Sequence, residues 1–440
     1  MKSRRTRFSR PVHPLSVIGG VLAATAVSFR ASAQEALRST LSLDQTLATQ
    51  QNRAVDLGPV QPHIGPVPFS LSVDSGFQFE DNINAAQTNP QADVILHSSL
   101  NTSFHWAATD QSEVDLNAGV GYSRYLKYSQ NDRVDFAPTS ALTWNVLLQD
   151  VTLTFYDQFS YTEDVVTQGA LSDLATFPVF DNVTGFRASW TPDAWLFQAG
   201  YSHDEYFSDL SALNYLNRTS EYFFARGAWR FAENTQAGLE ASASITAFEI
   251  SAQAGNTSIS IGPFADWQIT EAIRATLRGG PTIYLFDAQP GAGSNSGTRL
   301  NSYYAGAQLN QQLTDYLSHQ VSVQREVSLG LNEGGNFLTQ LTAAYSLTYS
   351  QTRFLDIGIN AAYERGTQTF QNEIVIAEGL GFLVNQTENY DHYAVGPSFT
   401  WHATDKLTAS LNYNYYLRDS NLAGRGYQDN TVAFKVDYAF

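Results

Sequence analysis

The chain ends with Thr431-Val-Ala-Phe-Lys-Val-Asp-Tyr-Ala-Phe440, a stretch that alternates strictly between apolar and mostly polar residues. Val432, Phe434, Val436, Tyr438 and Phe440 take every second position. Because successive side chains of a β-strand point to opposite faces, this pattern predicts a strand with one apolar face and one largely polar face.

The same alternation recurs along the chain from Phe69 onward. In the first segment Phe69, Leu71 and Val73 share one face. About 18 segments follow this rule, and most reach the roughly 9–11 residues that a tilted strand needs to cross a bilayer. They lie at residues 69–80, 94–106, 114–122, 136–146, 151–161, 186–190, 195–201, 223–231, 237–247, 259–269, 273–285, 303–313, 317–329, 341–349, 355–363, 393–401, 407–417 and 431–440.

Two kinds of connection alternate between these segments. Short turns occur at residues 109–110, 149–150, 191–193, 233–235, 270–271, 314–315, 351–352 and 404–405. Longer, irregular connections include residues 81–92, 164–178, 207–215, 287–297, 366–389 and 418–426. Short turns on one side and long loops on the other are typical of a membrane barrel, and this pattern predicts an even number of about 18 strands.

Tryptophan residues gather at one end of the predicted strands. Trp195 lies just after a short turn, and the other six lie just before one: Trp106, Trp144, Trp190, Trp229, Trp267 and Trp401. Tryptophan prefers the membrane–water interface, where its ring is buried and its N–H stays hydrated. The sequence therefore predicts an aromatic girdle at the end that carries the short turns.

The N-terminus has the organisation of a secretory signal peptide. Basic residues between Lys2 and Arg10 precede an apolar run from Leu15 to Val27, and Ala31-Ser-Ala33 supplies a cleavage site. We therefore expect three regions: a signal peptide at residues 1–33, a periplasmic arm or linker at 34–67, and a barrel at 68–440. Glycine and proline are frequent in the second half of the arm.

Composition excludes several classes of function. The formal charge is -17, and removal of residues 1–33 takes away six basic and no acidic residues, leaving -23. Such a chain repels nucleic acid. It contains no cysteine, so it has neither disulfides nor thiolate metal sites. The sequence contains no catalytic or cofactor-binding motif, and its histidines have no metal-ligand spacing, so we expect no catalytic, cofactor or metal site. His203-Asp204-Glu205 is the one acid–histidine cluster.

A secreted, soluble β-protein would show the same alternation, but it would not place its short turns and tryptophans at one end of the strands. We therefore predict an all-β fold, a transmembrane antiparallel up-and-down β-barrel. The continuous apolar face must then contact lipid, and the polar face lines the interior. A barrel of 16–18 strands is too wide for side chains alone to fill, so it leaves an aqueous channel unless loops fold in.

A charged cluster occupies the predicted lumen face. Its candidate members are Arg187, Arg226, Arg230, Arg274, Arg278, Glu240 and Asp266. Arginines that face acidic groups create a transverse field that can hold anionic or sugar-like solutes. The alternative is an internal ion-pair network that only stiffens the wall. Arg325 breaks the apolar face of its strand, either because it reaches lipid phosphate or because the register slips locally.

Residues 69–440 resemble the Gram-negative outer-membrane β-barrel porin families, including the group associated with exopolysaccharide genes. The resemblance rests on Asp81-Asn-Ile83, on the Thr-Asp turns and on the ending Val436-Asp-Tyr-Ala-Phe440. It implies placement in the bacterial outer membrane, with Tyr438 and Phe440 as the assembly signal. The implied partners are outer-membrane lipid and lipopolysaccharide, the barrel-assembly machinery, and small hydrophilic solutes or saccharides.

Two functions follow from this resemblance. The first is a porin-like channel for passive diffusion of small hydrophilic solutes. The second is a barrel component of a polysaccharide export or adhesion system, which binds glycan or a periplasmic partner through the loops at 164–178 and 366–389. The acidic constriction-loop motif of trimeric general porins is not present in the sequence.

Overall fold

The structure is a computed structural model that describes residues 62–65, 67–137, 140–162, 165–232, 234–288, 297–335, 337–377 and 380–440, with the backbone alone for 370–384. The predicted signal peptide and nearly all of the predicted arm lie outside these residues. No helix of the described part is long and apolar enough to cross a membrane.

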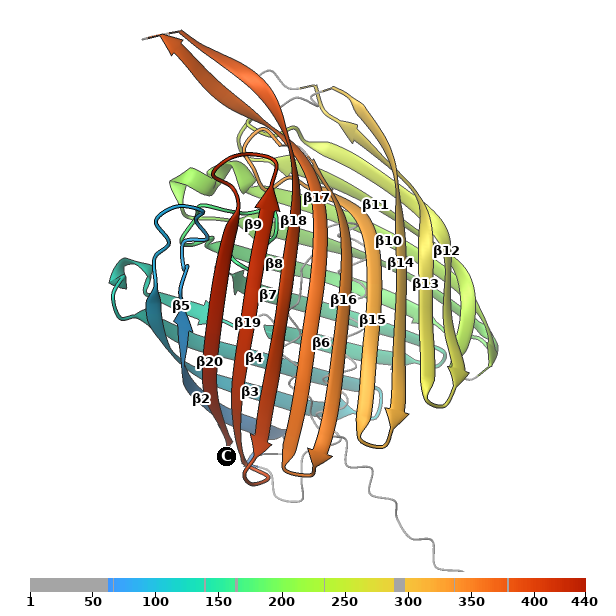
Figure 1. Cartoon of the computed structure of the whole chain (residues 1–440). Coiled ribbons are helices and arrows are strands. Elements are labelled where there is room, and N and C mark those ends of the chain that lie inside the picture. Colours follow the sequence, from blue (N-terminus) through green and yellow to red (C-terminus); the bar gives the residue numbers. More distant parts are fainter. Residues whose placement is uncertain are drawn as a thin grey trace, which may run out of the picture.

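The described residues form one antiparallel sheet that closes on itself (Figure 1). Strands at neighbouring positions of the wall follow one another in the sequence, and the last strand pairs with the first, Ser72 with Ala439 through Glu80 with Thr431. The barrel strands are β2 Val67–Glu80, β3 Asp93–Thr109, β4 Ser112–Tyr125, β5 Arg133–Phe136 with β6 Ser140–Leu148, β7 Val151–Thr162, β8 Val179–Trp190, β9 Trp195–Phe207, β10 Arg218–Ala232, β11 Thr235–Phe248, β12 Asn256–Thr270, β13 Ile273–Phe286, β14 Arg299–Thr314, β15 Leu317–Leu329, β16 Phe337–Thr352, β17 Leu355–Ala377, β18 Leu380–His402, β19 Leu407–Ser420 and β20 Tyr427–Ala439.

Because β5 and β6 both pair with β4 and together form one wall position, the barrel has 18 strands, which confirms the predicted architecture. The additional two-residue strand β1, His63–Ile64, pairs with the start of β2. Two 3-10 helices, η1 Ser129–Asn131 and η2 Ser211–Leu216, lie in the long connections. Closure satisfies the backbone groups of both edge strands, which is the condition for a sheet to stand in lipid.

The predicted alternation of short and long connections is confirmed among the described residues, with one exception; most of the predicted connection at 287–297 lies outside them. The predicted irregular connection at 366–389 is wrong, because β17 and β18 continue there as one hairpin, paired from Leu355 with Trp401 up to Ala377 with Leu380. The neighbouring strands end earlier, at Leu338 opposite Gln368 and at Ser420 opposite Tyr390. The alternating sequence of this stretch favours a strand ribbon even without neighbours.

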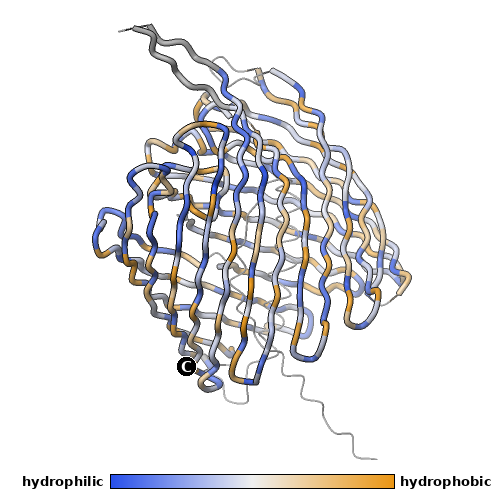
Figure 2. Tube along the Cα trace, in the orientation of Figure 1, coloured by the Kyte–Doolittle hydropathy of each residue, from blue (hydrophilic) through white to orange (hydrophobic). Residues whose placement is uncertain are grey.

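Apolar and polar side chains occupy opposite faces of the wall, and Figure 2 shows the alternation along the strands. The outer face exposes large apolar residues from nearly every strand, such as Leu239, Ile261 and Leu277. In a soluble protein this surface would be unstable, whereas in lipid it meets a matching solvent. The inner face carries polar residues in register, including a hydrogen bond between Ser260 and Thr282.

An apolar cluster fills part of the interior between the long connections. Four connections contribute to it: those between β2 and β3, between β7 and β8, between β9 and β10, and between β15 and β16. They meet tyrosines of the inner wall. The buried members are Ala85, Val165, Val166, Ala170, Leu171, Phe177, Val179, Leu213, Leu216, Leu331, Leu338, Tyr390, Ala394, Tyr416 and Tyr427.

Candidate functional site

The β7–β8 loop, described from residue 165 to 178, folds into the barrel and is fixed to the far-in-sequence wall of β17 to β20. Three side chains of that wall, and Arg425 from the connection between β19 and β20, donate hydrogen bonds to its backbone. The carbonyl of Gly169 accepts from Arg418 Nε at 2.7 Å, and that of Val166 accepts from the Tyr427 hydroxyl at 3.3 Å. The carbonyl of Ala170 accepts from Gln368 Nε2 at 3.1 Å and from Arg425 Nη2 at 3.4 Å.

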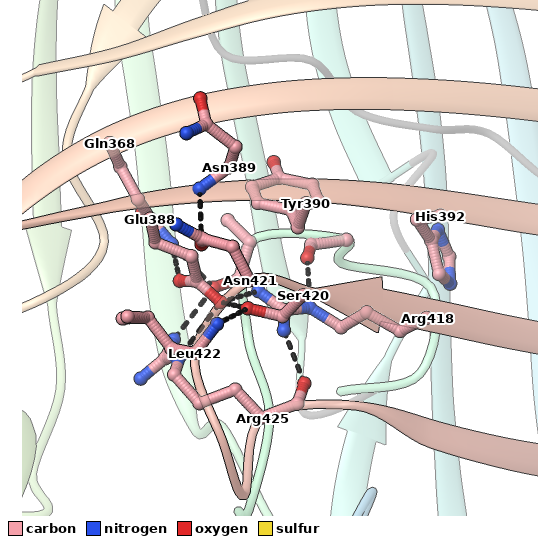
Figure 3. A network of polar contacts seen from close by, with 12 residues as sticks. Gln368, Glu388, Asn389, Tyr390, His392, Arg418, Ser420, Asn421, Leu422 and Arg425 are labelled. Atoms are coloured by element: carbon pink, nitrogen blue, oxygen red, sulfur yellow. Dashed lines mark hydrogen bonds and ion pairs between the residues drawn. The ribbon is translucent and has the colours of Figure 1, made fainter.

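Glu388 lies at the centre of the groups that hold this loop, as Figure 3 shows. Its Oε1 accepts from Arg418 Nη2 at 2.7 Å, from Arg425 Nε at 2.9 Å and from the Ser420 hydroxyl at 2.7 Å, and Oε2 accepts from Gln368 at 2.8 Å. The side chains of Glu388 and Arg418 are fully buried. Two cations and two neutral donors around one carboxylate compensate the cost of removing these charges from water. We call Gln368, Glu388, Arg418 and Arg425 the loop latch.

A second polar layer lies against the latch. The Tyr390 hydroxyl donates to Glu364 Oε1 at 2.5 Å, and Gln340 Nε2 donates to the same oxygen at 2.9 Å. The loop comes close to the wall at Gly169, because a Cβ at this position would stand 2.7 Å from Glu364 Oε1 and 3.1 Å from His392 Cβ. A larger residue here would therefore require the Glu364 side chain or the loop to shift.

Two more connections pack beside the β7–β8 loop. The Tyr215 hydroxyl in η2 donates to the Leu331 carbonyl at 2.9 Å. Burial, together with the negative charge of Glu333, raises the pKa of Tyr215 to about 12, so the hydroxyl keeps its proton and remains a donor. Gln253 Nε2 donates to the Gly330 carbonyl at 3.3 Å and so ties the β11–β12 connection to the same group.

The predicted lumen charge cluster has its centre on β10, β11 and β12. Arg226 pairs with Asp266 at 3.0 Å and stacks over the Phe264 ring at 3.6 Å. Glu240 stands opposite Arg226 in register and accepts from the Tyr304 hydroxyl at 3.1 Å. Charged groups from three neighbouring strands thus share one patch of the inner wall.

The other predicted members differ in their relation to this centre. Arg274 and Arg278 lie on the inner face of β13, where Arg278 interacts electrostatically with Glu240 and Arg274 with Asp266. Arg187 is buried on the inner face of β8 and interacts with Tyr156 instead. Arg230 does not join the centre, because its Nη2 donates to the Asp193 carbonyl at 2.6 Å in the turn region.

The charge cluster and the loop latch lie on opposite walls. β10 and β19 are nine positions apart in the closed 18-strand order, so Arg226 and Arg418 stand half way around the barrel from each other. Arg418 lies two residues from the long-loop end of β19 at Ser420, whereas Arg226 lies six residues from the short-turn end of β10 at Ala232, so a solute that crosses the lumen would meet the loop and the charged patch one after the other. This arrangement can narrow a path and apply a transverse field to what moves along it.

The tryptophans and the C-terminal residues are exposed on the outer face. Between 44% and 56% of each tryptophan is exposed, and each lies beside a short turn. Trp195 and Trp229 are register partners, and Trp144 Nε1 donates to the Ser112 hydroxyl at 2.8 Å. Tyr438 and Phe440 contact edge to face at 5.1 Å.

The structure divides one cluster of the sequence, and one expectation about a loop is wrong. His203-Asp204-Glu205 is divided by strand alternation, because His203 pairs with Glu221 at 2.9 Å on the outer face while Asp204 is buried near Tyr222. The loop at 164–178 is not an exposed contact surface, because Val165, Leu171 and Phe177 are buried in the interior cluster.

Sequence reasoning also missed the loop latch. Glu388 and Arg418 fall within stretches that were assigned to irregular connections, and Gly169 and Arg418 are 249 residues apart. The apolar content of the β7–β8 loop could have indicated that it folds inward. So many large apolar residues are unusual in a loop that faces water: Val165, Val166, Leu171 and Phe177.

No known protein family and no curated protein matches the sequence. Among solved structures, the chain is similar to the outer membrane protein OpdK from Pseudomonas aeruginosa, with a TM-score of 0.48 and 12% identity over 86% of this chain and 100% of that one. It is also similar to OpdF (OccK2) of Pseudomonas aeruginosa, with a TM-score of 0.48 and 11% identity over 87% and 99% of the two chains. For OccAB3 of Acinetobacter baumannii the TM-score is 0.46 and the identity 9%, over 86% and 100%. At these values the similarity concerns the fold alone, and the function of this chain must be argued from its own geometry.

Proposed function

We propose that the protein is an outer-membrane channel for the passive diffusion of small hydrophilic solutes. The observation that carries the proposal is the closed 18-strand wall with an apolar outer face and a polar inner face. A barrel of this width needs more than wall side chains to fill it, and one of its long loops is fixed inside. The result is a narrowed passage through an apolar membrane.

The charge cluster gives this channel a preference for anionic groups. Three arginines, Arg226, Arg274 and Arg278, stand against Glu240 and Asp266, so positive charge prevails at this centre on a chain that is otherwise strongly acidic. Arginine presents a planar fork that suits carboxylates and hydroxyl-rich solutes. Small acids and sugar acids are therefore the solutes that we expect to pass most readily.

Conductance of the refolded barrel in a planar bilayer tests this proposal. We expect stepwise insertions with ohmic current, and under a KCl gradient a reversal potential on the anion-selective side. Insertions that carry no current, together with no swelling of liposomes in a solution of a small sugar, would overturn it.

The interior cluster favours a second candidate, a barrel that its own loops close. Four connections pack there with buried Leu171, Leu213, Leu216 and Leu331. A closed barrel fits an outer-membrane component of polysaccharide export or adhesion, the role that the exopolysaccharide group suggests. In that case the bilayer experiment shows insertion without current, and the purified barrel retains a glycan or a periplasmic partner.

A further inference from the structure

The barrel wall is split between β14 and β15 above one residue pair. Their ladder runs from Thr314 with Leu317 up to Ala305 with Arg325. Beyond that pair, residues 299–304 of β14 pair with β13, and residues 326–329 of β15 pair with β16. Within the described residues the two strands have no pairing with each other above Arg325, which stands at the lower end of the split.

The inner side of the split is closed by an apolar cluster. Tyr284, Phe286 and Val327 are buried there, and Phe286 stacks on Phe337 at 6.0 Å. The Tyr284 hydroxyl reaches across and donates to the Val327 carbonyl at 3.0 Å. The split is thus a notch in the outer surface and not a second route into the lumen.

Arg325 is held in the notch by β14. Its guanidinium stacks over the Tyr303 ring at 3.8 Å, and Nη1 donates to the Tyr303 carbonyl and to the Ser302 hydroxyl at 3.4 Å. These contacts fix the guanidinium against β14. The Nε and Nη2 edge has no protein partner among the described residues, and this edge can bind two oxygens of one phosphate or carboxylate.

The register shows that Arg325 belongs on the outer face. The pairing of β14 with β15 has no register shift between Ala305 and Gln312, so a register slip does not explain why an arginine stands on the apolar face. Val323, two residues below it on the same face, is 43% exposed. Unpaired strand edges cannot lie in hydrocarbon, because their backbone groups would have no partners. The split therefore begins where the hydrocarbon ends, and Arg325 lies at the level of the lipid headgroups.

A second arginine stands at the same level. Arg325 is the register partner of Leu341, and Leu341 is the register partner of Arg365, so the two arginines are two strands apart, about 10 Å between backbones. Arg365 is exposed. Its register partner Asp391 accepts from the Tyr363 hydroxyl at 2.5 Å and lowers the local positive charge. Arg325 is therefore the stronger site for an anion.

We propose that Arg325, assisted by Arg365, binds the phosphate group of a phosphorylated lipid in the outer leaflet. The inference rests on the outer-membrane placement proposed above but not on conduction. A lipid is the occupant, and not free phosphate, because the guanidinium edge is flanked by exposed apolar surface from Tyr303 and Val323 that suits acyl chains. An uncompensated arginine on this face would be costly, and a phosphate removes that cost.

Native mass spectrometry of the refolded barrel in detergent tests this site, with lipid A and its fully dephosphorylated form as probes. Removing one arginine at a membrane surface weakens anionic lipid binding about fivefold, so we expect that loss for Arg325→Gln with lipid A. Arg325→Lys should lie between, because an ammonium cannot make the paired contact. Arg365→Gln should lose less than Arg325→Gln, and the dephosphorylated lipid should not discriminate among the variants.

Arg353→Gln is the matched control. Arg353 also stacks on an aromatic ring, that of Phe354 at 4.4 Å, but it lies in the β16–β17 turn at the other end of the barrel. Folding of each variant is checked by heat-modifiable mobility on a gel. Equal lipid A binding by Arg325→Gln and the unchanged chain would overturn the site, and so would an equal loss in Arg353→Gln. Displacement by equimolar inorganic phosphate would assign the site to free anions and overturn the lipid. A barrel that binds lipid A through Arg325 but carries no current would contradict the channel alone.

Discussion

At the scale of single residues, Arg226 contributes both to the stability of the wall and to the charge that ions meet in the lumen. Its pairing with Asp266 and its stacking on Phe264 fix the guanidinium against the wall, and its side chain is 10% exposed. An ion pair that faces a water-filled lumen contributes about 1 kcal/mol or less to stability. Its charge still acts on ions in the passage, because a fixed charge about 7 Å away changes an ion's energy by about 0.6 kcal/mol even in water.

We therefore expect Arg226→Ser to lower the ratio of chloride to potassium permeability about sevenfold, since that energy corresponds to a factor of about 2.7 for each ion at room temperature and acts in opposite directions on the two. Asp266→Asn should raise the ratio, because it removes the opposing charge. The reversal potential of single channels under a KCl gradient measures both changes. Arg353→Ser, at the short turn outside the lumen cluster, serves as the control and should leave the ratio unchanged.

A different result would assign the pair to stability alone. If both variants unfold at lower denaturant concentration but keep the reversal potential of the unchanged channel, Arg226 and Asp266 only stiffen the wall. Opposite shifts in the two variants cannot arise from loosened packing, because both lose the same contact.

At the scale of elements, the β7–β8 loop owes its position to groups that the chain supplies much later. The single guanidinium of Arg418 donates to three groups: the Gly169 carbonyl, Glu388 and the Arg425 carbonyl. Removing Arg418 leaves Glu388 with one cation, Arg425, in place of two, so the cost stays below the roughly 3–5 kcal/mol of a buried charge that loses its whole partner. The loop keeps the hydrogen bonds from Gln368, Arg425 and Tyr427, so we expect the loss of Arg418 to loosen the loop around Gly169 and not to release it entirely.

Arg418→Met should therefore increase single-channel conductance and current noise, and should speed liposome swelling with larger sugars. Glu388→Gln in the same chain should restore part of the stability but not the closed loop, because the donor to Gly169 is still missing. Gly169→Val is an independent probe without charge, since its Cβ would meet Glu364 and His392 and displace the loop. Unchanged conductance in both Arg418→Met and Gly169→Val would show that the loop does not narrow the passage.

The elements also show how much the sequence could reveal. Strand periodicity and turn chemistry are local, so the eight short turns and most strand segments could be predicted from neighbours in the chain. The inward fold of the β7–β8 loop depends on Arg418 and Tyr427, which are more than 240 residues away, and nothing local distinguishes an inward loop from an outward one. The extension of β17 and β18 beyond the barrel could not be predicted for another reason. There the two strands pair only with each other, so no neighbouring strand determines where they end.

At the scale of the whole molecule, closure depends on one pairing between the two ends of the sheet. β20 and β2 are joined from Ser72 with Ala439 to Glu80 with Thr431, and Phe77 packs on Phe434 at 5.7 Å. Lys435 adds an ion pair with Asp74 at 3.2 Å on the inner face. Since the other strand contacts are between sequence neighbours, they can form before this one. The last pairing is what converts an open sheet into a barrel.

Deletion of Phe440 tests whether the final residue serves assembly more than transport. Phe440 adds one hydrogen bond to closure, from its N–H to the Leu71 carbonyl at 2.9 Å, and its ring is 54% exposed on the outer face. Loss of this one bond should reduce stability by only about 1 kcal/mol, so barrels that do form should conduct as before. An aromatic residue that serves recognition during insertion should instead be needed early, and the deletion should sharply lower the amount of folded barrel in the outer membrane. Heat-modifiable protein in membrane fractions measures the first quantity and single-channel conductance the second.

Phe440→Trp, which keeps an exposed aromatic ring, should restore insertion. Normal insertion of the deletion variant would exclude Phe440 as the assembly signal, and altered conductance in the barrels that form would give the residue a structural role in the pore wall.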